Sequence, residues 1–124
     1  MMMKLICRRI AAAMMIVCGC VLLGVCAAAA QQDDLLGPDR WPTTVEDTVR
    51  NILARLPAED KQRLKTIRKE DLIQFHHGWG TGIRNYYGLW RGNTKLLAAA
   101  CGRPCHPDDA SGIIIEAVWQ ELQK

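Results

Sequence analysis

The apolar N-terminus is the feature that most constrains this chain, because it decides how many residues remain to fold. The short basic segment Met1–Arg9 is followed by an uncharged apolar run from Ile10 to Cys26. Small residues come next, with Ala28 and Ala30 at the −3 and −1 positions of a cleavage site. This order is typical of a secretory signal. We therefore expect residues 1–30 to be a signal peptide and the protein to be periplasmic or secreted.

Two other interpretations of this segment stay open. The run from Ile10 to Cys26 is 17 residues long, shorter than the roughly 20 that span a membrane, but the alanines lengthen it. Residues 10–30 are therefore an alternative membrane anchor; otherwise we expect membrane contact only before cleavage. Lipidation is the other alternative. Val25 before Cys26 fits a lipidation site poorly, and cleavage before Cys20 would leave an apolar new terminus.

Removal of the leader changes the charge and length of the protein. Three of the 16 basic residues lie in residues 1–30, which leaves 13 basic against 13 acidic residues in a mature chain of about 94 residues. Without a basic excess, nucleic-acid binding has no electrostatic support. This length allows one domain with a modest core. We expect a flexible lead-in over residues 31–40 and a helical domain over residues 41–124.

Apolar residues recur with helical spacing throughout the mature chain, and no segment alternates with a period of two. The fold class is therefore predicted to be all-α, a small bundle of four or five short helices. Thr43 or Thr44 is expected to cap the first helix, and Asn93 a later one. Pro107 suits the first turn of the last helix. The expected helices cover residues 44–56, 58–69, 70 onward, 94–100 and 107–122.

Glycines interrupt the third expected helix. Leu72, His76, Trp79 and Ile83 form a helical stripe, but glycines occupy positions 78, 80 and 82. Each interior glycine costs a helix about 1 kcal/mol relative to alanine. Either tight packing offsets this cost or the helix breaks here.

Cys101 and Cys105 are the only cysteines after the leader. In an exported domain, two close cysteines are expected to form a disulfide. His106 follows directly, so a variant c-type haem attachment, with His76 or His77 as second axial ligand, is an alternative. Zinc binding by the same residues is another. The haem motif has one residue too many between its cysteines, and we expect neither a cofactor nor a metal.

A group of polar residues is the best candidate for chemistry. We expect Arg84, which follows an inward-facing position, to pair with Asp108 or Asp109 at the start of the last helix, because an unpaired buried charge is costly. Ser111, His106 and Asp108 also supply the residue types of a catalytic triad, but no nucleophile elbow surrounds the serine.

Several blocks of sequence occur in a characteristic order: Ile83-Arg84-Asn85, Gly88-Leu89-Trp90, Gly92-Asn93, and His106-Pro107-Asp108-Asp109-Ala110-Ser111. With Trp41-Pro42-Thr43 at the start, they resemble a bacterial family of small domains of unknown function over about residues 41–122. The resemblance implies a compact helical domain, often exported, with no assigned activity. It brings no catalytic residues.

The most consistent functional hypothesis is a non-catalytic binding or interaction domain of the cell envelope, whose ligand is a protein or a small molecule. A small hydrolase or transferase that uses His76, Arg84 and Asp108 is the alternative, and the haem protein is the third. Four tryptophans and two tyrosines suit a recognition surface. The candidate binding residues are His76, Arg84, Asn85, Trp90, Asn93, His106, Asp108 and Asp109.

Overall fold

The computed structural model describes residues 35–124. The expected signal peptide, its cleavage site and the anchor alternative lie outside the described residues. Within residues 35–124 the regular structure is entirely helical, which confirms the all-α class. None of the helices in this part of the chain is long and apolar enough to cross a membrane.

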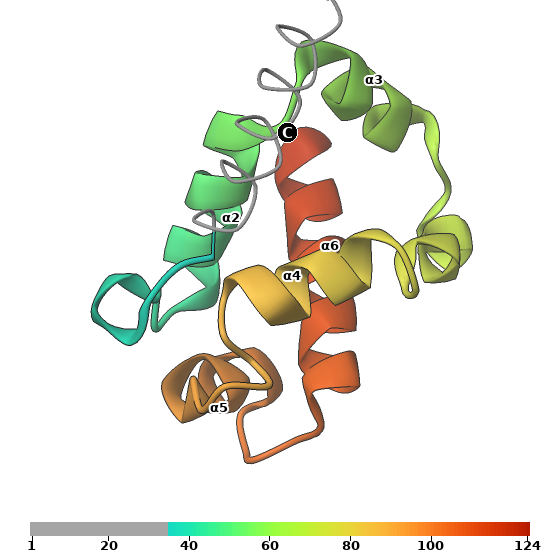
Figure 1. The fold of residues 1–124 in the computed structure, drawn as a ribbon. Coiled ribbons are helices and arrows are strands. Elements are labelled where there is room, and N and C mark those ends of the chain that lie inside the picture. The colour runs from blue at the N-terminus through green and yellow to red at the C-terminus, as the bar shows by residue number, and fades with distance from the viewer. Residues whose placement is uncertain (1–34) are drawn as a thin grey trace, which may run out of the picture. The chain divides into compact units, whose positions relative to one another are not determined.

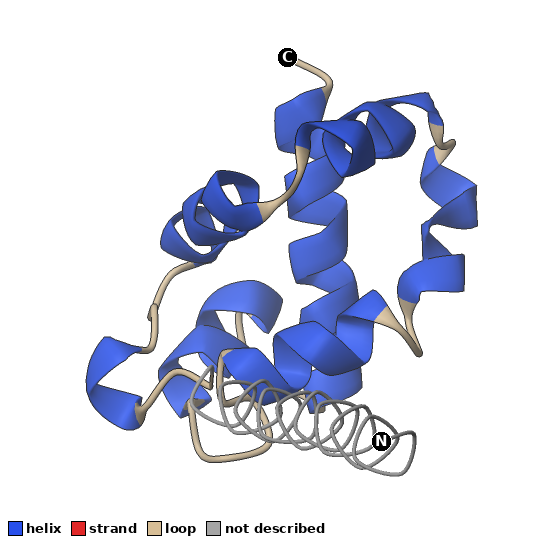
Figure 2. Cartoon of the chain, turned by 45° about the horizontal axis from the view of Figure 1, so that its top comes forward, coloured by secondary structure: helices blue, strands red, loops and turns tan. Residues whose placement is uncertain are grey.

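Five α-helices and two short 3-10 helices make up the domain (Figures 1 and 2). The 3-10 helices are η1 (Pro38–Arg40) and η2 (Lys69–Phe75). The α-helices are α2 (Val45–Arg55), α3 (Ala58–Thr66), α4 (Trp79–Tyr86), α5 (Thr94–Cys101) and α6 (Pro107–Leu122).

The last helix, α6, is the centre of the domain. It contacts α2, α3, η2, α4 and α5, and Figure 1 shows the other helices arranged around it. Ala110, Ile114, Ile115 and Val118 place nearly all of their surface in the core. Their helical spacing brings them to a common side of α6, so burying that side accounts for much of the hydrophobic stabilisation.

Side-chain and proline caps set the helix starts that the sequence predicted. Thr44 accepts a hydrogen bond from the backbone N–H of Asp47, and Asn93 accepts one from Leu96. Pro107 occupies the first turn of α6, where its missing N–H costs nothing. These local signals explain why the starts of α2, α5 and α6 agree with the expected boundaries.

The third predicted helix is not continuous. Residues 69–75 form the 3-10 helix η2, a turn follows, and α4 begins only at Trp79. Gly78 lies outside the helical region of backbone conformation, with φ −85° and ψ −85°. The stripe from Leu72 to Ile83 nevertheless faces the core at both ends, because both residues are buried. The glycine-rich segment therefore breaks the helix and does not simply weaken it.

The second helix is shorter than predicted and ends at Thr66. Ile67 has an extended backbone, and its carbonyl accepts a hydrogen bond from the indole Nε1 of Trp119 on α6, at 2.9 Å. This tertiary contact, across 52 positions of sequence, is made at the residue where the chain leaves the helical conformation.

Residues 35–40, which composition assigned to a flexible lead-in, contact the domain. The Leu36 carbonyl accepts hydrogen bonds from Trp41 Nε1 at 2.8 Å and from Arg91 at 3.0 Å. The Trp41 ring lies against Gly88, where an added Cβ would come within 2.2 Å of it, and the φ of Gly88 is +71°. Only glycine suits that position, because it needs both a left-handed backbone and free space.

Candidate functional site

Helices α4 and α6 pack against each other (Figure 1), and two of the candidate residues, Arg84 and Asp108, come together at this contact. Arg84 on α4 has only 7% of its side chain exposed, and its Nε lies 3.2 Å from Oδ1 of Asp108. The expected contact between Arg84 and the start of the final helix is therefore present, and Asp108 makes it. Asp109, the other candidate partner, is exposed.

Arg84 also makes three hydrogen bonds. Its Nη1 donates to Ser111 Oγ at 2.9 Å and to the His76 carbonyl at 3.3 Å, and its Nη2 donates to Thr81 Oγ1 at 2.9 Å. Its Nε makes no hydrogen bond within the described residues, because the N–H is not aligned with the nearby Asp108 carboxylate. Asp108 thus balances the charge, and the other groups supply the directed bonds.

A glycine makes room for this arginine. A Cβ at Gly80 would lie 3.1 Å from Arg84 Nη1 and 3.3 Å from the Phe75 carbonyl, closer than most such contacts. Gly82, two positions further along α4, has nothing within 4 Å of the same point. Tight packing therefore explains the first glycine of α4 and does not explain the second.

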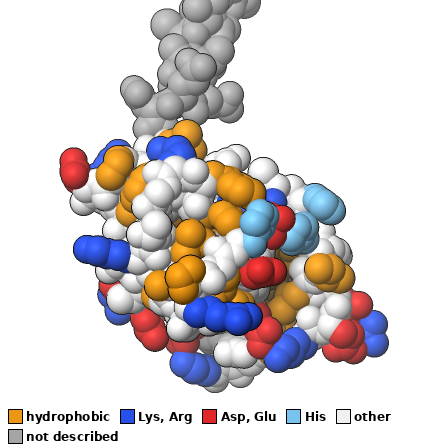
Figure 3. All heavy atoms as spheres, turned by 90° about the horizontal axis from the view of Figure 1, so that it is seen from below, with side chains coloured by type: hydrophobic (Ala, Val, Ile, Leu, Met, Phe, Trp, Pro, Cys, Tyr) orange, Lys and Arg blue, Asp and Glu red, His pale blue; other side chains and the backbone are white. Residues whose placement is uncertain are grey.

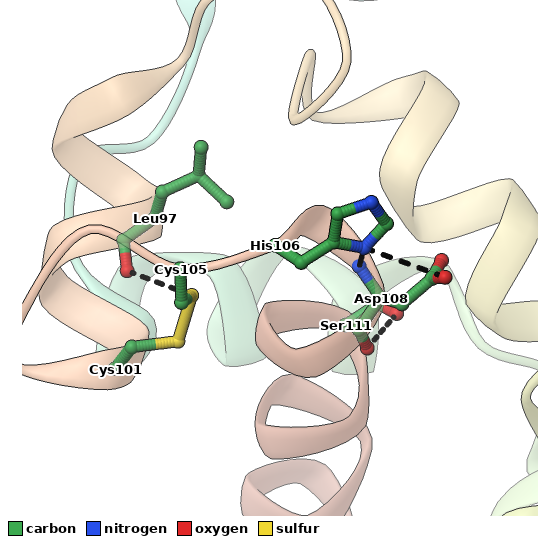
Figure 4. The surroundings of a disulfide bond; sticks show 6 residues. All are labelled: Leu97, Cys101, Cys105, His106, Asp108 and Ser111. Atoms are coloured by element: carbon green, nitrogen blue, oxygen red, sulfur yellow. Dashed lines mark hydrogen bonds and ion pairs between the residues drawn. A yellow bond between two sulfur atoms is a disulfide. The ribbon is translucent and has the colours of Figure 1, made fainter.

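The first turn of α6 holds the residue types of the proposed triad in a different arrangement (Figure 4). His106 Nδ1 accepts a hydrogen bond from the Asp108 backbone N–H at 3.3 Å, so the imidazole caps the helix. Ser111 is fully buried, and its hydroxyl donates to the Asp108 carbonyl at 2.9 Å while it accepts from Arg84. The histidine and serine do not meet, and the serine is not accessible as a nucleophile.

Trp90 is the large aromatic side chain most exposed to solvent, at 52%, among residues 35–124. It packs edge-on against the His106 ring, with ring centres 5.1 Å apart. Its neighbour Leu89 is buried, and Asn93 closes the turn with a backbone hydrogen bond to Gly88 at 3.0 Å. The turn is therefore fixed, although its tryptophan projects outward.

The remaining candidate residues divide into structural and exposed ones. Asn93 is buried, and its amide donates to the carbonyls of Pro42 and Tyr87. The side chain of Asn85 is exposed. His76 meets Arg84 through its backbone carbonyl, and its imidazole packs edge-on against His77. The structure thus does not bring all eight candidates into one cluster.

Two partners of Arg84 were not recognised as such from the sequence. Thr81 precedes Arg84 by three positions, so it lies on the neighbouring turn of the same helix. That spacing was a usable signal. Ser111 lies 27 positions away, and only the packing of α4 on α6 brings it to the guanidinium. Local sequence carries no comparable signal for it.

The predicted disulfide joins Cys101 at the end of α5 to Cys105 (Figure 4). Bonded sulfurs are not free to form thioether bonds to haem or to bind zinc as thiolates. No group of three or more histidine, cysteine or acidic side chains in the described part of the chain is arranged to hold a metal ion. The disulfide closes the loop between α5 and α6.

A family model described as a domain of unknown function, DUF6794, matches residues 41–122. Because the match covers most of the chain, the protein belongs to this family. The resemblance seen in the sequence is confirmed to that extent. No curated protein and no solved structure matches the chain significantly.

Proposed function

We propose that this member of the DUF6794 family is an exported, non-catalytic binding domain that recognises a protein partner through a surface centred on Trp90. The observation that carries the proposal is a half-exposed tryptophan on an otherwise fixed turn. The surface consists of Trp90, His106, Asp108 and Asp109, and we call it the Trp90 surface.

A tryptophan held in this way suits recognition. Buried tryptophans are among the largest single contributors to binding at protein interfaces, and they act from the centre of a well-packed patch. The turn around Trp90 is held by Asn93 and the buried Leu89, so little conformational freedom remains to be lost on binding. Such preorganisation raises affinity because it lowers the entropic cost of association.

Polar groups border the indole. His106 lies against it, the Asp108 carboxylate lies 3.4 Å from His106 Nδ1, and Asp109 is exposed one position further along α6. Figure 3 shows histidine and acidic side chains gathered beside hydrophobic ones on this side of the molecule. An apolar anchor with a polar rim is the usual anatomy of a protein interface.

Export is part of the same proposal. The order of basic, apolar and small residues over 1–30 supports it. The bond between Cys101 and Cys105 also supports it, because disulfides persist mainly in oxidising compartments. A periplasmic or secreted location fits both observations.

The hydrolase or transferase alternative receives less support from the geometry. Arg84 is buried and engaged by four groups, so it is not available to a substrate. His76 turns its backbone carbonyl, not its imidazole, toward the arginine. A general acid or base needs its titrating atom within hydrogen-bond reach of the reacting group.

Site-specific photocrosslinking in the organism of origin tests the proposal. A photoreactive phenylalanine analogue replaces Trp90 in one strain. In the control strain it replaces Ile73, which is 74% exposed on η2. We expect a discrete crosslinked protein from position 90 only. Mass spectrometry should identify the same partner in each repeat. Added wild-type protein should compete for the partner and suppress the crosslinked adduct, whereas added Trp90→Ala protein should not. Identical adducts at both positions, or none at position 90, would contradict the Trp90 surface.

A further inference from the structure

A hollow of about 270 Å³ lies between α2 and α4, away from the Trp90 surface. It exists because α2 and α4 pack mainly against α6 and hardly against each other. Its walls are apolar and aromatic: Ile52, Leu56, Trp79, Ile83, Tyr86 and Tyr87. Gly82 also lines it, and the open space at the missing Cβ of Gly82 adds to the room available.

One cation lies at this hollow. The guanidinium of Arg55 is stacked on the Tyr86 ring, 3.9 Å from its centre. Within residues 35–124 Arg55 forms no ion pair with a carboxylate, whereas Arg50 and Arg63 each have one and Arg68 has two. The side chain is thus held by an aromatic face while its charge has no anionic partner in the described domain.

The buried phenol of the wall, that of Tyr87, does not neutralise this charge. The hydroxyl of Tyr87 donates to Asn51 Oδ1 at 2.7 Å. Burial raises the pKa of Tyr87 to about 12, although the nearby charge of Arg55 acts in the opposite direction. The Tyr87 phenol is therefore neutral at physiological pH, and the residues that line the hollow include no carboxylate.

A second hollow, of about 250 Å³, shares Leu56 and Trp79 with the first. Phe75 and Leu64 add apolar wall, and the two charged residues at its edge, Asp60 and Arg63, lie 3.7 Å apart as an ion pair. The charge at this end is therefore balanced. The only uncompensated charge along the two hollows, among the residues that line them, is that of Arg55.

We infer that the α2/α4 hollow binds a small amphipathic carboxylate, such as a medium-chain fatty acid. The carboxylate pairs with Arg55, and the apolar chain extends along Trp79 toward the second hollow. A guanidinium grips a carboxylate with two parallel hydrogen bonds, which fixes the head of the ligand. The apolar wall provides the burial that drives small-molecule binding. This inference does not depend on the Trp90 surface.

Calorimetric titration of the full chain with decanoate tests the inference, with decanol as the uncharged probe and decyltrimethylammonium as the cationic one. We expect saturable 1:1 binding of decanoate, binding at least about tenfold weaker for decanol, and none for the cation. Arg55→Gln should weaken decanoate binding about tenfold or more, because the charge-assisted pair is lost. Equal affinity for decanoate and decanol would overturn the role of Arg55.

Two glycine variants separate the hollow from other apolar surface. Gly82→Leu fills open space beside the hollow and should abolish decanoate binding. Gly112→Leu, in α6, is the matched control, because its Cβ also has nothing within 4 Å but it does not line the hollow. Leucine favours helices more than glycine does, so both variants should fold, which circular dichroism checks. All variants share residues 1–34, so binding there is constant. Unchanged binding in Gly82→Leu would overturn the inference.

Discussion

Arg84 and Arg55 lie in two regions of one small domain and have opposite surroundings. Arg84 is buried at the crossing of α4 and α6, where a carboxylate, two hydroxyls and a carbonyl surround it. Arg55 is exposed on α2, stacked on a tyrosine ring, with no carboxylate of the described chain beside it. All the partners of Arg84 belong to the domain itself, whereas the charge of Arg55 remains available to a ligand.

The same contrast extends to the surroundings of each arginine. Around Arg84 the packing is tight enough that Gly80 has no room for a methyl group without a shift of its neighbours. Around Arg55 the helices α2 and α4 leave a hollow, and Gly82 faces open space. Gly80 therefore lies in the tightly packed region around Arg84, and Gly82 lies beside the hollow near Arg55.

The largest expected effect is the loss of Arg84. Arg84→Ala should lower the free energy of unfolding by about 2–4 kcal/mol, because it removes three hydrogen bonds and leaves the Asp108 carboxylate without its cation. Arg84→Lys keeps the charge but not the fork of donors and should lose less. Urea unfolding of the full chain measures both. A loss below about 0.5 kcal/mol for the alanine variant would contradict a structural role.

The pH dependence of stability tests whether the Tyr87 phenol near Arg55 is buried and neutral. The pKa of Tyr87 is raised to about 12 in the folded state, so the folded protein holds its proton while an unfolded tyrosine releases it above pH 10. Stability should therefore fall as pH rises from 10 to 12, by about 2 kcal/mol from this group. Tyr87→Phe should lack that part of the decrease. Parallel stability curves for the two proteins would show that the phenol is not buried.

The smallest effect distinguishes the two glycines of α4. Gly82→Ala should raise the free energy of unfolding by up to about 1 kcal/mol, since alanine favours the helix and nothing obstructs its methyl group. Gly80→Ala should give no gain or a loss, because its Cβ would press on Arg84 and the Phe75 carbonyl. Thermal unfolding compares the pair. A gain in both variants would show that the packing around Arg84 is looser than described.

The sequence predicted those features that local signals encode. The caps Thr44 and Asn93 and the proline at the start of α6 set boundaries that the structure confirms. Caps and helix starts depend on interactions within a few residues. The pairing of Arg84 with the first turn of α6 is not local, and it was predicted because an unpaired charge next to an inward-facing stripe is costly.

Features that depend on tertiary packing could not be predicted in the same way. The stripe from Leu72 to Ile83 fits a continuous helix, yet the chain breaks at Gly78 and keeps both residues buried. The end of α3 depends on Trp119, which lies 52 positions away. The α2/α4 hollow is lined by residues from separate helices, so no single sequence motif predicts it.

One set of unfolding measurements tests the central claim that Arg84 holds the fold and Arg55 meets a ligand. Urea unfolding is followed for wild-type protein, Arg84→Lys and Arg55→Gln, each with and without decanoate. The decanoate concentration is the same throughout, about 100 times the dissociation constant of the wild-type protein. Ligand binding at that concentration should stabilise the wild-type protein by about 2.7 kcal/mol. Arg84→Lys should be less stable but keep this gain. Arg55→Gln should lose at most about 1 kcal/mol of basal stability, from its stacking on Tyr86. It should also lose about half of the gain or more, because a ligand that binds tenfold more weakly stabilises by only about 1.4 kcal/mol at the same concentration. The reverse pattern, or an undiminished gain in Arg55→Gln, would contradict the account.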